Sequence, residues 1–360
     1  MSSSIYSIIT GTGSYIPTKV VKNEDFWNSE FYDSKGNKME KDPKEITAKF
    51  EEITTIAERR YVTDDLVTSD IAFFAAQKAI ESAGIDPEEL DHIIVAHNFG
   101  DVAADNMRSD MVPSIASRVK HKLGIKSPYA VCYDVPFGCP GWVEALIQAD
   151  YYIKAGDDKK VLVIGADTLS RIYDPHDIDS MIYADGAGAV ILEAKESDTP
   201  IGILAHQTRS DTELHSKMLV MSKSYHPELA KTDKIFMKMN GRRLYQYALE
   251  NVPMSISKAL KKANVELSEV KKLLIHQANG KMDDAMCERL YKIYDLPQPE
   301  NIMPMTVQWL GNSSVATVPT LLDLIMKGKM EPHKIESGDI IIFTSVGAGM
   351  NINAVIYKSV

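Results

Sequence analysis

Short apolar runs alternate along the chain with longer amphipathic segments. Three of these runs have the bulk and length of buried strands: Asp91–Ala96, Lys160–Ile164 and Ile340–Phe343. Apolar spacing predicts a helix over Ser69–Gly84, with Asp70 as its cap and Gly84 where it stops. Strands separated by helices predict a layered α/β fold. The charged, polar stretch Tyr32–Lys44 is predicted to be a surface insertion.

The second half of the chain repeats patterns of the first in the same order. The matching pairs are Ala79–Val95 with Ala259–Ile275, Gly138–Gly141 with Gly311–Ser314, and Gly186–Gly188 with Gly347–Gly349. The ordinary recurrence of α/β units is the alternative explanation. We interpret the pattern as a duplication that divides the chain into halves 1–197 and 198–360. Gly138–Gly141 and Gly311–Ser314 would each open a helix.

Cys139 is the first candidate for chemistry, because it lies between a strand-like run and a predicted helix start. The positive end of a helix dipole favours a thiolate, which is the nucleophile of acyl-transfer reactions. The alternative is a small buried cysteine without a chemical role. Cys132, in the middle of a predicted strand, and Cys287, in a helix interior, are interpreted in that structural way.

His276 and Asn312 are the second and third candidates. His276 ends an apolar strand, and functional groups of α/β proteins gather at the carboxyl ends of strands. Asn312 occupies the position in the second half that Cys139 occupies in the first. A pseudo-twofold axis between the halves would bring both helix starts and His276 to one cleft, where an amide and an imidazole can stabilise an oxyanion. No metal-ligand spacing is recognisable, so no metal site is predicted.

Composition narrows the class of protein. The chain has 360 residues, of which 44% are hydrophobic and 25% charged, with a net charge of −10. The acidic balance argues against a nucleic-acid binder, and no apolar run approaches the ~20 residues of a membrane span. The start of the chain lacks the pattern of a signal peptide. The chain has only three cysteines, and an odd number cannot all pair, which argues against a disulfide framework. We therefore expect a reducing, cytoplasmic setting.

The chain resembles β-ketoacyl-acyl-carrier-protein synthase III, a member of the thiolase-fold condensing enzymes. The stretches that carry the resemblance are Gly11–Pro17, Asn23–Asp25, Glu58–Arg59, Ser69–Asp70, Gly138–Gly141, Asp185–Val190, His276–Asn279, Gly311–Ser313 and Val346–Gly349. The resemblance implies a duplicated five-layer α/β/α/β/α fold and a homodimer. It also implies an acyltransferase of fatty-acid biosynthesis that needs no metal or redox cofactor.

The same resemblance implies roles for individual residues. Cys139 would accept the acyl group of an acyl-CoA thioester. His276 and Asn312 would stabilise the enolate that forms when a malonyl thioester decarboxylates, and the carbanion would then attack the acyl-cysteine. Backbone N–H groups of Cys139 and Ala348 would form a second oxyanion hole. The acyl carrier protein is acidic, and the candidate basic residues that would receive it are Arg242, Arg243 and Lys281.

Several positions depart from the family pattern. Lys49 and Ile53 stand where the family has a Trp and an Arg that clasp the adenine of CoA, and Val346 replaces an aromatic residue. Val112 stands before Pro113 in place of Phe, at the end of a longer loop. These departures favour, as an alternative, a specialised condensing enzyme of polyketide, pigment or other secondary metabolism that uses a carrier-bound or β-oxo acyl donor.

Other readings fit the residues less well. A thiolase would carry a second cysteine in Ser345–Met350, and an elongating ketosynthase would have a histidine at Asn312. A cysteine protease would also use Cys, His and Asn in this order, but its local signature and architecture are missing. A partner subunit without activity would normally have lost the nucleophile.

Overall fold

Two mixed β-sheets form the frame of the computed structural model, which describes residues 4–360. The strand order is β1-β9-β8-β4-β7 in the first sheet and β10-β15-β14-β13 in the second. The strands of these sheets are β1 (Ser4–Tyr15), β4 (His92–Ala96), β7 (Val131–Val135), β8 (Lys160–Thr168), β9 (Asp185–Ser197), β10 (Gly202–Ser210), β13 (Val270–Ile275), β14 (Ile340–Gly347) and β15 (Asn351–Lys358). Each sheet joins parallel strands to an antiparallel flank.

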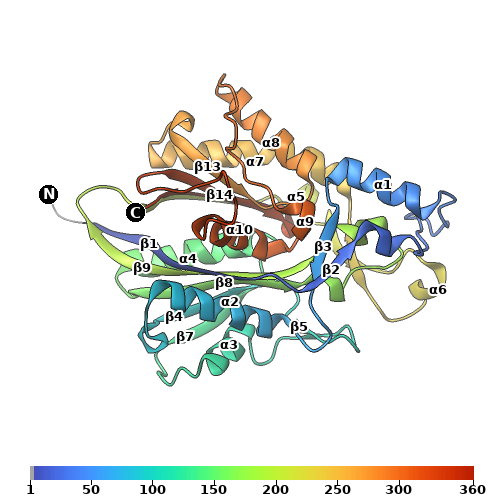
Figure 1. The fold of residues 1–360 in the computed structure, drawn as a ribbon, viewed down its shortest axis with the longest axis horizontal. Helices are drawn as coiled ribbons and strands as arrows, with labels where there is room; N and C mark the ends of the chain where they lie inside the picture. Colours follow the sequence, from blue (N-terminus) through green and yellow to red (C-terminus); the bar gives the residue numbers. More distant parts are fainter. Residues whose placement is uncertain (1–3) are drawn as a thin grey trace.

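Helices cover both sheets and fill the space between them. The main helices are α1 (Pro43–Thr54), α2 (Thr68–Ala83), α3 (Ile115–Leu123), α4 (Gly141–Ala155), α7 (Gly241–Ala263), α8 (Gly280–Ile293) and α10 (Thr317–Met326). Figure 1 shows α2 and α3 outside the first sheet, α4 and α10 between the sheets, and α7 and α8 outside the second. This is the predicted five-layer α/β/α/β/α arrangement of the thiolase-like fold.

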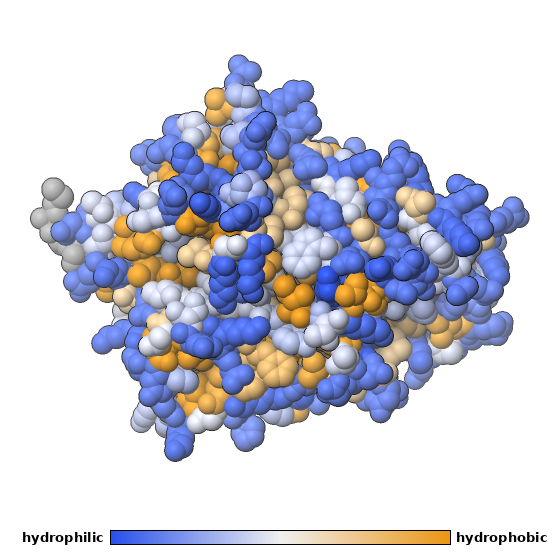
Figure 2. All heavy atoms as spheres, viewed as in Figure 1, coloured by the Kyte–Doolittle hydropathy of each residue, from blue (hydrophilic) through white to orange (hydrophobic). Residues whose placement is uncertain are grey.

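The remaining elements are short. They are β2 (Lys19–Lys22), β3 (Glu58–Tyr61), β5 (Asp101–Val102), β6 (Ser109–Asp110), β11 (Leu219–Ser222), β12 (Phe236–Met239), α5 (Thr212–His215), α6 (Pro227–Ala230) and α9 (Val307–Leu310). β11 and β12 pair as an antiparallel hairpin. None of the helices in residues 4–360 is long and apolar enough to cross a membrane. Figure 2 shows hydrophilic residues over most of one face, with smaller hydrophobic patches between them.

Layer position explains the composition of the helices. α4 and α10 contact a sheet on each side, and their side chains are buried almost all round. α2 covers one sheet only and lies very close to β1. A Cβ on Gly13 would come 2.3 Å from the carbonyl oxygen of Ala75, and one on Gly11 would come 2.4 Å from that of Ala79. The Gly-x-Gly pattern therefore serves helix packing within a strand that runs to Tyr15.

The predicted strands and the helix before Gly84 are confirmed, with some changes at their ends. β8 and β14 run further than their apolar cores predicted. Asp70 is not the N-cap of α2; it is the third helical residue, and its carboxylate accepts a hydrogen bond from the N–H of Val67. The helix expected to open at Gly311 begins only at Thr317, after a 3₁₀ turn. The division at 197/198 stays a prediction; β9 ends at Ser197 and β10 begins at Gly202.

A buried carboxyl group in α8 gives a stability prediction. Asp283 is 0% exposed, and neither carboxyl oxygen has a hydrogen-bond partner in residues 4–360. Burial raises its pKa well above the usual value, so the folded state favours the neutral acid. That stabilisation is complete below pH 4 and is lost as the pH rises toward the folded-state pKa. We expect Asp283→Asn to raise the free energy of unfolding at pH 7 by about 1–3 kcal/mol.

Thermal unfolding at several pH values measures this effect. The advantage of Asp283→Asn should be clear at pH 7 and should vanish near pH 3, below the ordinary Asp pKa of 3.8, where the carboxyl is protonated in both states. Glu288→Gln is the matched control, because Glu288 lies exposed on the same helix. An advantage of the same size at both pH values would contradict the prediction.

Candidate active site

Cys139 lies in the connection from β7 to α4, and glycines let the opposite half of the fold come close to it. Gly138 has φ +70°, and a Cβ there would lie 2.9 Å from the backbone nitrogen of Ala348. A Cβ on Gly347 would lie 2.7 Å from the backbone nitrogen of Cys139. The two loops thus meet backbone to backbone. The N–H groups of Cys139 and Ala348, predicted to form an oxyanion hole, belong to these two touching loops.

His276 directly follows β13, where its backbone N–H donates to the carbonyl of Thr344 at 2.9 Å. The side chain is 3% exposed, and Nδ1 has no hydrogen-bond partner in residues 4–360. Burial lowers the pKa of His276 to about 4, although a hydrogen bond with the backbone of Ser314 acts in the opposite direction. The imidazole is therefore neutral at physiological pH and carries a single N–H, which the backbone of Ser314 and a bound oxygen would share.

Asn312 is held at its backbone and at its side chain. Its N–H donates to the carbonyl of Ile182 at 3.0 Å, and its carbonyl accepts from Ala184 at 2.8 Å. The side-chain Oδ1 accepts from the backbone N–H of Ser314 at 2.8 Å. Because this bond occupies the oxygen of the amide, the Nδ2 group remains as the donor.

The structure brings the three predicted residues together. Cys139, His276 and Asn312 line one cavity of about 260 Å³ between the two halves. The rest of its wall is largely apolar, and much of it comes from the β11–β12 hairpin: Leu219, Val220, Met221, Met237 and Met239. A cavity of this kind suits an alkyl chain attached to a reactive carbonyl group.

A buried ion pair fastens the hairpin over this inner cavity. Lys238, 5% exposed on β12, lies 2.6 Å from Asp174 and 2.8 Å from Asp177. Asp174 also accepts a hydrogen bond from Ser224 Oγ at 2.9 Å. Lifting the hairpin would leave these charges without partners, which is costly in a buried setting.

The sulfur of Cys139 does not have the low pKa that its place before a helix led us to expect. Burial raises the pKa of Cys139 to about 11, and the negative charge of Asp167 acts in the same direction. The Ser314 hydroxyl opposes both, because its Oγ donates to Sγ at 3.3 Å. The apolar wall of the cavity around this partly exposed residue therefore outweighs the helix end.

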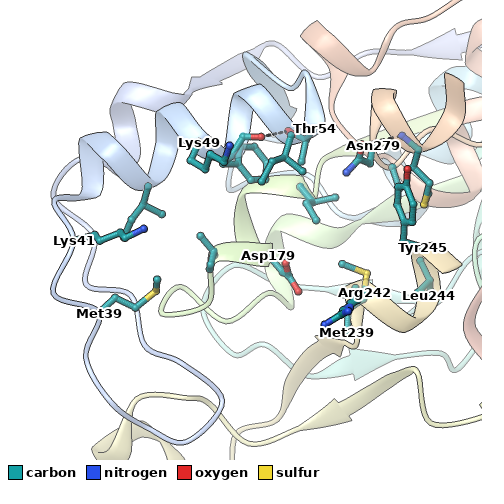
Figure 3. Close-up of a pocket in the computed structure, with 18 of the residues that line it drawn as sticks. Met39, Lys41, Lys49, Thr54, Asp179, Met239, Arg242, Leu244, Tyr245 and Asn279 are labelled. Carbon is teal, nitrogen blue, oxygen red and sulfur yellow. Dashed lines mark hydrogen bonds between the residues drawn. The ribbon is translucent and has the colours of Figure 1, made fainter. Parts of the chain in front are cut away.

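A second cavity of about 660 Å³ adjoins the first and shares Ile182, Met239 and Met282 with it. Figure 3 shows Lys49 on α1 and Arg242 at the start of α7, with Asp179 between these elements. This outer cavity gives a continuous apolar lining toward the inner one, with charged groups along its wall.

The predicted basic residues, the predicted insertion and the two other cysteines differ in whether they line the outer cavity. Of the three candidate carrier-binding residues, Arg242 lines the outer cavity, whereas Arg243 and Lys281 are exposed but do not line it. The stretch Tyr32–Lys44 is more than a surface insertion, because Met39 and Lys41 line the outer cavity and α1 begins at Pro43. Cys132 lies in β7 and Cys287 in α8, as predicted.

Two polar residues near the sulfur of Cys139 were not predicted from the sequence. Asn98, on the loop after β4, and Ser314 both line the inner cavity. Asn98 Nδ2 donates to Ser314 Oγ at 2.8 Å and to Asp167 Oδ2 at 2.6 Å. Ser314 stands in the motif that contains Asn312, which was the one available signal.

Comparison with known proteins agrees with this architecture. The family model for 3-oxoacyl-(acyl-carrier-protein) synthase III matches residues 133–212, and the model for the C-terminal part of that synthase matches residues 260–359. Together these ranges span half of the chain.

Solved structures of synthase III are similar over nearly their whole length. The enzyme from Aquifex aeolicus is 29% identical with a TM-score of 0.77, and covers 98% of this chain and 99% of its own. The enzyme from Thermus thermophilus is 29% identical with a TM-score of 0.78, at 98% of both chains. The priming β-ketosynthase of the R1128 polyketide pathway shares the fold at 24% identity, with a TM-score of 0.81, over 100% of this chain and 98% of its own.

The family models and the synthase III structures agree with each other along the chain, and they agree with its five-layer fold. The protein belongs to the 3-oxoacyl-(acyl-carrier-protein) synthase III family of condensing enzymes.

Proposed function

We propose that this ketosynthase-III-like acyltransferase works through Cys139, His276 and Asn312. The convergence of these three residues on one apolar cavity carries the proposal. In the first half-reaction, Cys139 Sγ attacks the carbonyl carbon of an acyl thioester. The bond from that carbon to the donor sulfur breaks, and the donor thiol leaves with a proton. The acyl chain then occupies the inner cavity.

In the second half-reaction, a malonyl thioester loses CO₂. The electron pair of the broken C–C bond passes to the α-carbon and the thioester oxygen as an enolate. The N–H of neutral His276 and the Nδ2 group of Asn312 donate to that oxygen. The α-carbon attacks the acyl carbonyl, the new C–C bond forms, and the bond to Cys139 Sγ breaks. Backbone N–H groups of Cys139 and Ala348 stabilise the negative oxygen during each attack on the acyl carbonyl.

The outer cavity is proposed to hold the thioester arm of the substrate. Lys49 and Ile53 line it in place of the Trp and Arg expected for an adenine clasp. Lys49 is also paired with Glu52 at 2.8 Å. These two positions keep one positive charge but offer no aromatic ring for stacking on a nucleobase. The lack of this ring therefore favours the second candidate, a specialised condensing enzyme with a carrier-bound or β-oxo donor, over initiation of fatty-acid synthesis from acyl-CoA.

The acidic acyl carrier protein is proposed to dock at the opening of the outer cavity. Arg242 lines that cavity. Arg243 on α7 and Lys281 on α8 are exposed basic residues, and both are proposed to contact the carrier protein as well. Lys41 extends the same charge along the insertion. Electrostatic attraction of this kind speeds encounter more than it adds affinity, and salt should weaken it.

A homodimer is proposed through β7, which is the last strand of the first sheet. An edge strand presents unpaired backbone groups to another chain. Val131 on this strand is 47% exposed, and neighbouring Tyr129 is 85% exposed. Pairing of two β7 strands would cover both, and it would place each nucleophile loop near the subunit contact.

The scheme uses no metal or redox cofactor, since acyl-CoA or acyl carrier protein and the malonyl thioester are substrates. A reducing cytoplasm is the proposed setting. Cys132, Cys139 and Cys287 all carry free thiols, and the mechanism requires that of Cys139.

Intact-protein mass spectrometry with a panel of acyl-CoA and acyl-carrier thioesters tests the proposed function. We expect a mass gain equal to the acyl group, retained on the peptide that contains Cys139. Acylation mainly from acyl-CoA would favour the initiating enzyme, whereas acylation only from carrier-bound or β-oxo donors would favour the specialised one. If none of the donors acylates the protein, the alternative of a partner subunit without activity replaces this proposal.

A further inference from the structure

A line of hydrogen bonds leads from a buried carboxylate to the sulfur of Cys139. Asp167, 1% exposed in β8, accepts from the backbone N–H of Asn98 at 2.8 Å and from its Nδ2 group at 2.6 Å. Asn98 Nδ2 also donates to Ser314 Oγ at 2.8 Å. Ser314 Oγ in turn donates to Cys139 Sγ at 3.3 Å.

Donor chemistry fixes the direction of this line. Burial raises the pKa of Asp167 to about 6, so at pH 8 the carboxylate is ionised and can only accept, and it holds the amide of Asn98 with its NH₂ group toward the carboxylate. One hydrogen of that group points to Asp167 and the other to Ser314. Ser314 Oγ accepts from Asn98, so its single hydrogen remains to be donated, and Cys139 Sγ accepts it at 3.3 Å; the hydroxyl also lowers the pKa of Asp167, so that carboxylate competes for the same hydrogen.

We propose that Asn98 and Asp167 are positioning residues that commit the Ser314 hydroxyl as a donor to Cys139 and thereby stabilise its thiolate. The proposal rests on the proposed function in one respect, that Cys139 is the nucleophile. A thiolate occurs twice in that reaction. It attacks the donor thioester, and it leaves again when the C–C bond forms and the electron pair of the C–S bond returns to Sγ.

The surroundings leave the sulfur few other means of stabilisation. The titratable groups that face it are Asp167, His276 and Tyr183. Burial keeps His276 neutral by lowering its pKa to about 4, so it forms no ion pair with a thiolate. The negative charge of Asp167 raises the pKa of Cys139, whereas the hydroxyl of Ser314 lowers it.

Alkylation of Cys139 by iodoacetamide tests the proposal in the full-length protein. The rate is followed by peptide mass spectrometry from pH 6 to 11 in wild type, Asn98→Leu, Ser314→Ala and the double variant. A hydrogen bond to a charged group predicts that each single variant reacts about tenfold more slowly than wild type at every pH below the thiol pKa of about 11, so that its whole rate profile is displaced toward higher pH. If Asn98 acts through Ser314, the double variant should be no slower than Ser314→Ala.

Additive losses of about a hundredfold in the double variant, or an Asn98→Leu rate profile that coincides with that of wild type, would overturn the proposal. The control position is Asn106, an exposed residue between β5 and β6, and Asn106→Leu should react like wild type. If Asn98→Leu does not fold, Asn98→Ser replaces it, because serine is too short to reach both Asp167 and Ser314. Iodoacetamide needs no acyl donor, so failure of this line and failure of the proposed function give different results.

Discussion

Cys139→Ala is expected to abolish formation of the acyl-enzyme. The methyl group of alanine cannot attack a thioester, and the other two thiols are placed where they cannot substitute. Cys132 lies in β7, and Cys287 is 0% exposed, with a pKa that burial raises to about 12. Loss of a nucleophile lowers turnover by at least about 10⁴-fold. Intact mass after incubation with the best donor measures the outcome directly.

The control for this experiment is Cys132→Ala, which removes a partly exposed thiol outside both cavities. It should acquire the acyl group at the wild-type rate. A Cys139→Ala protein that still gains a stable acyl mass would show that another residue is the nucleophile.

His276→Ala and Asn312→Ala should separate the two half-reactions. Both variants should still form the acyl-enzyme, because neither side chain is assigned to the first attack. Release of CO₂ from a malonyl thioester should fall by about 10²–10³-fold in each, which is the usual effect of removing one oxyanion donor. Since the pKa of His276 is lowered to about 4, the wild-type rate should show no titration of this group between pH 6 and 8.

Asn312→Asp makes the second test sharper. Its carboxylate can still accept from the N–H of Ser314, as Oδ1 of Asn312 does at 2.8 Å, so the loop should keep its shape. The group that donates to the enolate is nevertheless lost, and decarboxylation should fall as far as in Asn312→Ala. Release of CO₂ at the wild-type rate by both Asn312 variants would remove the assigned role.

Much of this fold could be predicted from local patterns. Apolar runs gave strands at β4, β8 and β14, and the order of repeated motifs indicated two similar halves. The same symmetry gave a reason for Cys139, His276 and Asn312 to meet, and the structure places all three at one cavity. Each of these inferences depends on residues that are neighbours in sequence or equivalent under the repeat.

What could not be predicted depends on contacts between distant segments. Asn98 and Ser314 are 216 positions apart, and only the packing of the halves joins them. Much of the wall of the inner cavity comes from the β11–β12 hairpin, which no sequence motif predicted. The pKa of Cys139 was expected to be low because a helix start is visible in the sequence, whereas the burial that raises it is visible only in three dimensions.

The contact between the two glycine loops has a consequence for how such an enzyme can diverge. At Gly138 and Gly347 the halves touch through main-chain atoms, so the place of the sulfur is set by the backbone rather than by neighbouring side chains. Phe137 and Val346 can therefore change in kind without moving the nucleophile. Substrate preference can thus change during evolution without a change in the position of the nucleophile, provided that Gly138 and Gly347 are retained.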